Sequence, residues 1–124
     1  MTQSEDLIKE LEPFVKAVFE RKALDVVLLD VRELTSVADV FIICSGQSSR
    51  QVMAIAETIK SELRNRRIKP SNVEGISEGH WVLLDYGHIV YHIFYEPIRA
   101  FYDLEGLWTD ARRIATDAFT FTRE

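Results

Sequence analysis

Apolar residues near the start of the chain recur every three or four positions. This spacing runs from Leu7 to Phe19 and predicts an amphipathic helix to about Glu20. Pro13 lies inside the stretch and cannot donate the backbone hydrogen bond that a helix interior requires. We therefore expect either a kink at Pro13 or a second helix that begins with Pro13 in its first turn.

Two short apolar runs follow, "ALDVVLLDV" (23–31) and "VFIICS" (40–45). Both contain β-branched residues and predict buried strands, with a polar connection between them. Ser48, with Gln51 three residues later, is typical of a helix N-terminus, so a helix begins after the second strand. Its predicted buried face consists of Val52, Ile55, Ala56, Ile59 and Leu63.

The second half of the chain predicts a short strand near Val73, within the turn-rich residues 67–79. A β-hairpin follows, with strands over roughly 80–85 and 88–95, and then a helix with Pro97 in its first turn. The apolar face expected for this helix comprises Ile98, Phe101 and Tyr102. Helices interleaved with strands and one hairpin indicate an α/β fold, a mixed β-sheet flanked by helices.

The length of 124 residues fits one domain, and 47% hydrophobic with 28% charged residues is typical of a globular protein. We expect this domain to span residues 1–108. Residues 109–124 are polar and unpatterned, and we expect a C-terminal extension there. The start of the chain is acidic where a signal or transit peptide would be basic, and no apolar run approaches a membrane span. These features predict a cytoplasmic protein.

The net charge of −5 bears on the partners of the protein, because the chain has 15 Lys and Arg against 20 Asp and Glu. Proteins that bind nucleic acid through its phosphates normally carry an excess of basic residues. A basic protein is therefore a more natural partner than naked RNA or an anionic membrane.

The stretch "WVLLDYGHIVYHIF" (81–94) contains the polar residues most suggestive of chemistry. A two-residue turn at Tyr86-Gly87 would align the strands so that neighbouring side chains share one face. Because both faces of this hairpin are largely apolar, one can pack on the domain's own helices. The other needs further helices or a partner. One of the two faces carries the predicted pairs Asp85 with His88, Leu83 with Val90, and Trp81 with His92.

None of these groups predicts a catalytic, cofactor or metal site. His88 and His92 would be about 13 Å apart along a strand, too far to share one metal ion. Asp85 with His88 could form an acid–base pair, but no nucleophile is expected beside them, and a surface polar contact is favoured. Cys44, the only cysteine, falls in an apolar strand and is interpreted as a buried hydrophobic residue.

Two further segments have both a structural and a functional interpretation. "SGQSSRQ" (45–51) joins a strand to a helix N-terminus but lacks the pattern of a phosphate-binding loop, so a turn and cap are favoured. A basic cluster falls at the end of the same helix, where cations stabilise the helix dipole. That explanation is favoured, and an accessory contact with RNA stays open. The cluster consists of Lys60, Arg64, Arg66, Arg67 and Lys69.

Several blocks in order, "ADVFIICSGQSSRQVMAIAE", "VEG", "WVLLDYG", "VYHIF" and "FYDLEGLW", resemble the ribosomal silencing factor family (RsfS, also called Iojap). The resemblance covers about residues 24–108. It implies a mixed α/β domain similar to the nucleotidyltransferase fold. It also implies binding to the large ribosomal subunit at its basic protein fourteen, on the face that meets the small subunit. Such binding blocks subunit joining and represses translation, and isolated members form homodimers.

By this resemblance, "WVLLDYG" belongs to the surface that meets the ribosomal protein. We expect Trp81 and Leu83 to anchor the contact and Asp85 to meet Lys or Arg on the partner. Arg99 and Tyr102 match the C-terminal block of the family, as does Trp108. They either support the interface or hold the last helix on the sheet. One departure is His88, where an acidic residue is expected after "DYG", so the charge of the hairpin tip would depend on pH.

A nucleotidyltransferase-like or nucleotide-binding enzyme is the alternative that the fold similarity raises. That chemistry requires paired carboxylates on a strand to hold divalent metal ions. No predicted strand carries an acid–apolar–acid triplet, and Asp103-Leu104-Glu105 falls in a segment expected to be helical. The sequence therefore favours a non-enzymatic binding protein without a cofactor.

Overall fold

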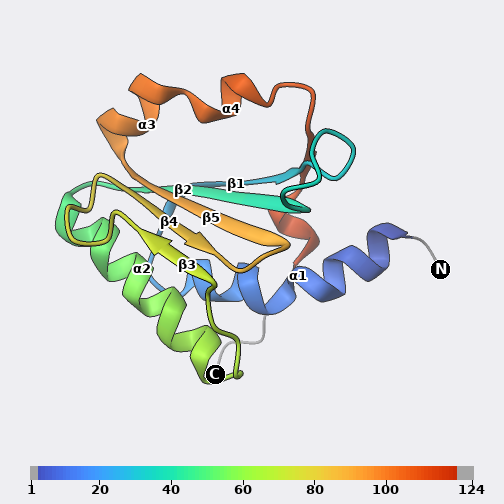
Figure 1. Cartoon of the computed structure of the whole chain (residues 1–124), viewed down its shortest axis with the longest axis horizontal. Coiled ribbons are helices and arrows are strands. Elements are labelled where there is room, and N and C mark those ends of the chain that lie inside the picture. The colour runs from blue at the N-terminus through green and yellow to red at the C-terminus, as the bar shows by residue number, and fades with distance from the viewer. Residues whose placement is uncertain (1–2, 120–124) are drawn as a thin grey trace.

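A mixed six-stranded sheet lies between helices in the computed structural model, which describes residues 3–119 (Figure 1). The strands lie in the order β3-β4-β5-β2-β1-β6, with β2 and β5 parallel and the other neighbours antiparallel. The predicted α/β fold is confirmed, whereas its similarity to the nucleotidyltransferase fold stays a prediction. The strands are β1 (Leu24–Asp30), β2 (Val40–Gly46), β3 (Asn72–Glu74), β4 (Trp81–Asp85), β5 (Ile89–Tyr95) and β6 (Arg112–Ile114).

Two long helices cover one face of the sheet, and two short helices lie on the other (Figure 1). The long helices are α1 (Gln3–Phe19) and α2 (Ser49–Arg64). The short ones are α3 (Glu96–Tyr102) and α4 (Leu104–Leu107). A 3-10 turn, η1 (Thr116–Ala118), follows the last strand. Over residues 3–119, no helix combines the length and the apolar content needed to cross a bilayer.

α1 packs on the sheet through the apolar face that its spacing predicts. Leu11 and Val15 are fully buried in the core between this helix, α2 and the sheet. Pro13 lies inside the helix, which continues to Phe19 as one element. The alternative of a second helix that begins at Pro13 is therefore wrong.

The start of α2 is capped as the sequence predicts. Ser48 Oγ accepts a hydrogen bond from the Gln51 backbone N–H at 3.1 Å, and the Gln51 side chain accepts one from the Gln47 N–H at 2.7 Å. The first bond satisfies a donor that the first turn of a helix leaves without a partner, and the second ties the residue before the cap to the helix. The predicted buried face of the helix is confirmed at Val52, Ile55, Ala56, Ile59 and Leu63.

The turn between β4 and β5 lies one residue later than the sequence predicts. Gly87 and His88 are the two turn residues, and the Tyr86 N–H donates to the Ile89 carbonyl oxygen at 2.9 Å. Gly87 has a φ of +92°, whereas His88 does not have a positive φ. That combination fits a turn with glycine in its first position, and it leaves Tyr86 in the strand register with its ring in the core.

This later turn moves every cross-strand pair by two positions, so the predicted register is wrong. Since side chains alternate between faces with a period of two, an even shift keeps the paired strand residues on their predicted faces. The predicted face assignment of the strand residues is therefore confirmed. The observed pairs are Trp81–Phe94, Leu83–His92 and Asp85–Val90, in place of Trp81–His92, Leu83–Val90 and Asp85–His88.

Two buried tyrosines in this hairpin differ in one hydrogen bond. Tyr91 Oη donates to the Phe14 carbonyl oxygen at 2.7 Å, whereas none of the described residues pairs with the Tyr86 hydroxyl. A buried hydroxyl without a partner costs about 1–3 kcal/mol, and a buried hydrogen bond contributes about 1 kcal/mol. We expect Tyr86→Phe to raise the free energy of unfolding by about 1 kcal/mol and Tyr91→Phe to lower it by about 1 kcal/mol. Urea denaturation of both variants checks this, and equal losses in the two would contradict it.

The C-terminal segment adds a strand to the sheet. β6 pairs with β1, with Ile114 opposite Leu28, and Arg112 Nη2 lies 3.7 Å from the Asp30 carboxylate. Hydrogen bonds from Arg32 to the same carboxylate lower the pKa of Asp30. A three-residue edge strand is held by backbone hydrogen bonds and needs no apolar side-chain pattern. The polar sequence of residues 109–124 therefore did not indicate β6. Residues 120–124 of the expected extension lie outside the described part of the chain.

Candidate functional site: a partly covered sheet face

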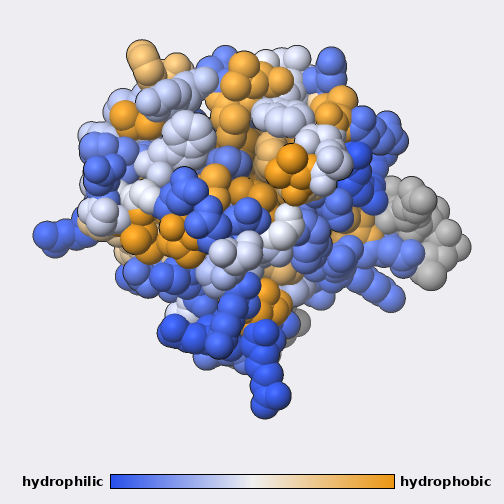
Figure 2. All heavy atoms as spheres, in the orientation of Figure 1, coloured by the Kyte–Doolittle hydropathy of each residue, from blue (hydrophilic) through white to orange (hydrophobic). Residues whose placement is uncertain are grey.

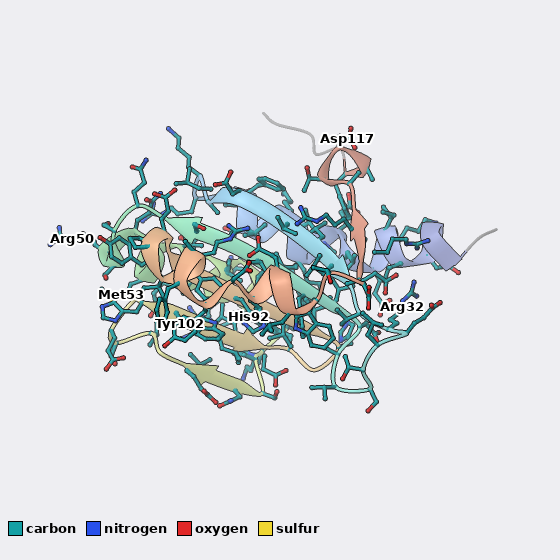
Figure 3. The ribbon with its side chains drawn as sticks, turned by 90° about the horizontal axis from the view of Figure 1, so that it is seen from above. Arg32, Arg50, Met53, His92, Tyr102 and Asp117 are labelled. Atoms are coloured by element: carbon teal, nitrogen blue, oxygen red, sulfur yellow. The ribbon has the colours of Figure 1, made fainter. Side chains whose placement is uncertain are left out.

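The sheet face opposite α1 and α2 is only partly covered. Viewed from above, α3 and α4 cross the middle of the sheet and leave β4 beside them (Figure 3). α3 contacts β5 and β2. The β4 side chains on this face, Trp81, Leu83 and Asp85, are all partly exposed. We call these three residues, together with Tyr102 of α3, the β4 surface.

Trp81 lies between the sheet and α3. Its ring centroid is 4.8 Å from that of Phe94 and 5.0 Å from that of Tyr102. The indole N–H donates to Nδ1 of His92 at 3.1 Å. The indole is therefore supported from within the protein while part of it remains exposed, as is typical of an aromatic anchor at a protein interface.

Polar side chains adjoin the apolar centre of the β4 surface. Glu74 and Asn72 of β3 pair with Leu83 and Asp85, so they lie on the same sheet face. The Asp85 carboxylate accepts the Gly87 N–H at 2.8 Å, and the Asn72 amide donates to Glu74 at 2.7 Å. Two carboxylates beside an apolar centre favour a partner that carries Lys or Arg.

Arg99 lies between α3 and the sheet. Its Nη1 donates to Ser45 Oγ at 2.7 Å, and its Nε and Nη2 donate to the Glu105 carboxylate at 3.3 and 2.7 Å. Only 11% of the Arg99 side chain is exposed. The hydrogen bonds from Arg99 lower the pKa of Glu105. Of the two roles that the sequence left open for Arg99, this geometry fits the one that holds the helices on the sheet.

His88 does not join the β4 surface. Its Nε2 lies 3.5 Å from the Glu10 carboxylate, and its ring packs edge-on against Phe14 with centroids 5.8 Å apart. Both contacts come from α1, on the opposite side of the sheet. The predicted pairing of Asp85 with His88 is wrong because His88 occupies the turn and points toward that helix.

The groups considered for catalysis are engaged in the fold. Cys44 is fully buried, and burial raises the pKa of its thiol to about 12, which suppresses the reactive thiolate near neutral pH. The Asp103 carboxylate accepts the Gly106 N–H at the start of α4, and Glu105 is paired with Arg99. Among residues 3–119, no three His, Cys, Asp or Glu side chains form a group able to hold a metal ion.

Burial lowers the pKa of His92 from 6.5 to about 4. Protonation below pH 6.5 therefore favours the unfolded chain, and the stability present above that pH is lost as the pH falls toward 4. By linkage, His92 alone should lower the free energy of unfolding by about 2 kcal/mol between pH 7 and pH 5. His92→Gln removes the titration, so the wild type should lose about 2 kcal/mol more than this variant over that range. Urea denaturation at both pH values checks this, and equal losses would refute it.

The outer sides of α3 and α4 expose large apolar residues. Phe101 is 79% exposed and Leu107 76% exposed, whereas Ile98 packs against a second apolar cluster on this face of the sheet, which includes Ile43 and Phe94. Of the apolar face expected for the helix after Pro97, Ile98 is packed, whereas Phe101 and Tyr102 are exposed. Apolar residues, drawn in orange, gather between these helices and the strands in Figure 2. Exposed apolar groups of this size are typical of an interaction surface.

The basic cluster lies at the end of α2 that leads toward β3 (Figure 1). Arg64, Arg66 and Arg67 are exposed, and Lys60 Nζ lies 3.8 Å from the Glu57 carboxylate. The Ser71 N–H, just after the cluster, donates to the Asp85 carbonyl oxygen at 2.7 Å. The chain that follows these arginines therefore joins the sheet beside the hairpin end of β4.

Comparison with known proteins gives consistent results for sequence and structure. A family model described as "Ribosomal silencing factor during starvation" matches residues 4–124. The ribosomal silencing factors RsfS of Halalkalibacterium halodurans and Bacillus subtilis are each 42% identical, over 82% and 74% of this chain and 86% and 78% of their own lengths. A crystal structure of a Bacillus halodurans protein has a TM-score of 0.77 at 36% identity, and covers 86% of this chain and 97% of its own. The chain therefore belongs to the ribosomal silencing factor family, RsfS.

Proposed function

We propose that this protein is a non-enzymatic translational repressor that binds the large ribosomal subunit and blocks joining of the small subunit. Its contact is large-subunit protein fourteen, a basic protein on the face where the subunits meet. The mechanism is steric, because a domain docked on that face occupies the space that the small subunit needs. The protein acts in the cytoplasm.

The observation that carries this proposal is the β4 surface. Trp81 and Leu83 form its apolar centre, and Asp85 lies beside them as an acceptor for Lys or Arg. The net charge of −5 also favours approach to a basic protein. Family membership supports the ribosome as the target. Arg99, one of the residues expected at the contact, acts from within by holding α3 and Tyr102 next to Trp81.

Co-sedimentation with isolated large subunits tests this function directly. We expect the purified protein to pellet with large subunits and not with small subunits. When small subunits are then added, light scattering should report fewer joined ribosomes than in a sample without the protein. Higher salt should weaken the binding, since part of the attraction is between opposite charges. Failure of the wild-type protein to bind large subunits, or joining that proceeds unchanged with the protein bound, would refute the proposal.

An accessory contact of the basic cluster with ribosomal RNA makes a separate prediction. If Arg66 and Arg67 both reach phosphates, replacing both by Ala should lower the slope of log Kd against log salt by about 2. The matched control replaces Arg112 and Arg113, two exposed arginines of β6, and removes the same charge elsewhere. Binding titrations at several salt concentrations measure the slopes. An equal decrease in both double variants would indicate only long-range attraction and would contradict the RNA contact.

The free protein is proposed to be a homodimer. Exposed apolar residues on α3 and α4 support self-association, because burial of such side chains favours a partner surface. Sedimentation equilibrium of the free protein tests this, and a single monomeric mass at high concentration would exclude it. The stoichiometry of the co-sedimented complex shows whether one copy or two copies of the protein bind each large subunit.

A further inference from the structure

Apart from the tyrosines, two polar side chains are buried among the residues described, Ser45 and His92. Each makes a hydrogen bond toward the partly covered sheet face. Ser45 accepts from Arg99, which holds α3 in place, and His92 accepts from Trp81. Burying a polar group in an apolar core costs free energy unless it is hydrogen-bonded. The two buried polar side chains therefore both form hydrogen bonds with residues at or next to the β4 surface.

His92 is fixed in its site from several sides. Its ring packs edge-on against Phe41 with centroids 5.1 Å apart and stacks on Phe94 at 6.5 Å. It lies diagonally across from Trp81, since its direct neighbour on β4 is Leu83. The indole reaches His92 along this diagonal.

We propose that His92 is a positioning residue for the Trp81 anchor. Its Nδ1 accepts the indole N–H and fixes the orientation in which the exposed part of the indole meets a basic protein partner. This inference rests on the proposed function of the β4 surface. Phe94 and Tyr102 support the ring by contact, but aromatic packing alone permits several orientations, whereas one hydrogen bond selects a single edge of the indole.

The chemistry of His92 suits this role. Acceptance at Nδ1 requires the neutral ring with its proton on Nε2. Burial lowers the pKa of His92 to about 4, so this neutral form persists near neutral pH. A leucine or phenylalanine would fill the same apolar site without a desolvation cost, but neither accepts a hydrogen bond. Histidine therefore differs from these residues in that it can fix the orientation of the Trp81 indole.

The first test uses the free protein and does not depend on the ribosome. Labelling with ¹⁵N gives one indole N–H resonance each for Trp81 and Trp108. His92→Leu removes the acceptor and should move the Trp81 indole resonance and speed its exchange with solvent. His92→Gln keeps an acceptor and should preserve much of the slow exchange. Because Phe41 contacts both His92 and Trp108, the Trp108 resonance can shift slightly, and the circular dichroism spectrum is the check that the fold is retained. A Trp81 resonance that stays unchanged in His92→Leu would overturn the inference.

The second test measures binding to large subunits. We expect His92→Leu to weaken binding about 5- to 10-fold and His92→Gln to restore part of it, a size typical of one hydrogen bond. Trp81→Phe lacks the indole N–H, so adding His92→Leu to it should weaken binding little further. Full additivity, or unchanged binding in His92→Leu despite a moved indole resonance, would overturn the positioning role. No binding by the wild type would instead refute the proposed function, while the resonance test still decides whether His92 orients Trp81.

Discussion

Trp81→Ala is expected to weaken binding to the large subunit at least about 30-fold, which corresponds to about 2 kcal/mol or more. Trp81 combines a partly exposed ring with support from Phe94, Tyr102 and His92. An anchor that is already held in place loses little conformational freedom on binding, so most of its contact energy becomes affinity. Quantitative co-sedimentation over a range of subunit concentrations measures the change.

The control for this variant must separate loss of the anchor from loss of the fold. Trp108→Ala removes the other tryptophan, whose ring packs edge-on against Phe41 with centroids 5.1 Å apart. Both variants remove aromatic packing on the same sheet face, but Trp108 lies outside the β4 surface. We expect folded circular dichroism spectra for both and a large loss of binding only for Trp81→Ala. Equal binding by Trp81→Ala and the wild type would show that the interface does not include the β4 surface.

Arg99→Met is expected to lower the free energy of unfolding by about 3 kcal/mol. The change leaves the Glu105 carboxylate, only 20% exposed, without its cation, and leaves buried Ser45 without its donor. Removing one partner of a buried ion pair costs more than the pair itself contributes, because the remaining charge stays poorly solvated. Since these bonds attach α3 and α4 to β2, the loss should also loosen Tyr102 beside Trp81. Urea denaturation measures the stability.

Two matched conditions test this explanation for Arg99. Replacing Glu105 by Met as well removes the unpaired carboxylate, so the double variant should regain much of the lost stability. The lowered pKa of Glu105 contributes stability above its unfolded pKa, and this contribution is lost as the pH falls through the folded value. The difference between wild type and Arg99→Met should therefore shrink in acid. A double variant as unstable as the single one would rule out the unpaired charge as the cause.

The elements with strong local signals could be predicted from the sequence alone. Ser48 and Gln51 mark the start of α2, and the continuous apolar run VFIICS identifies β2, which is buried on both faces of the sheet. β6 has no such signal, since a three-residue edge strand is selected by backbone pairing with β1 rather than by its side chains. The formation of β6 therefore depends on tertiary contacts and not on its local sequence.

The candidate site could also be predicted in part, where local sequence signals determine it. Alternation along the hairpin places Trp81, Leu83 and Asp85 on one face whichever of the two registers forms. The exact partners depend on the turn, and a single residue of difference there determines whether Trp81 meets His92 directly or diagonally. From the sequence, His92 was considered as a metal ligand and as the cross-strand neighbour of Trp81, but not as a hydrogen-bond acceptor. Its role as an acceptor depends on a side-chain direction that no sequence pattern specifies.

Both borders of the sheet are three-residue strands that carry charge, Glu74 on β3 and Arg112 with Arg113 on β6. Short charged borders discourage the backbone pairing through which exposed sheets polymerise. A chain that ended at Trp108 would instead leave β1, a seven-residue strand, as an open template for other chains. With both borders protected in this way, the proposed homodimer is expected to form through a face of the sheet. If that contact is isologous, with the same surface used by both copies, the proposed dimer closes at two copies rather than growing into a fibre.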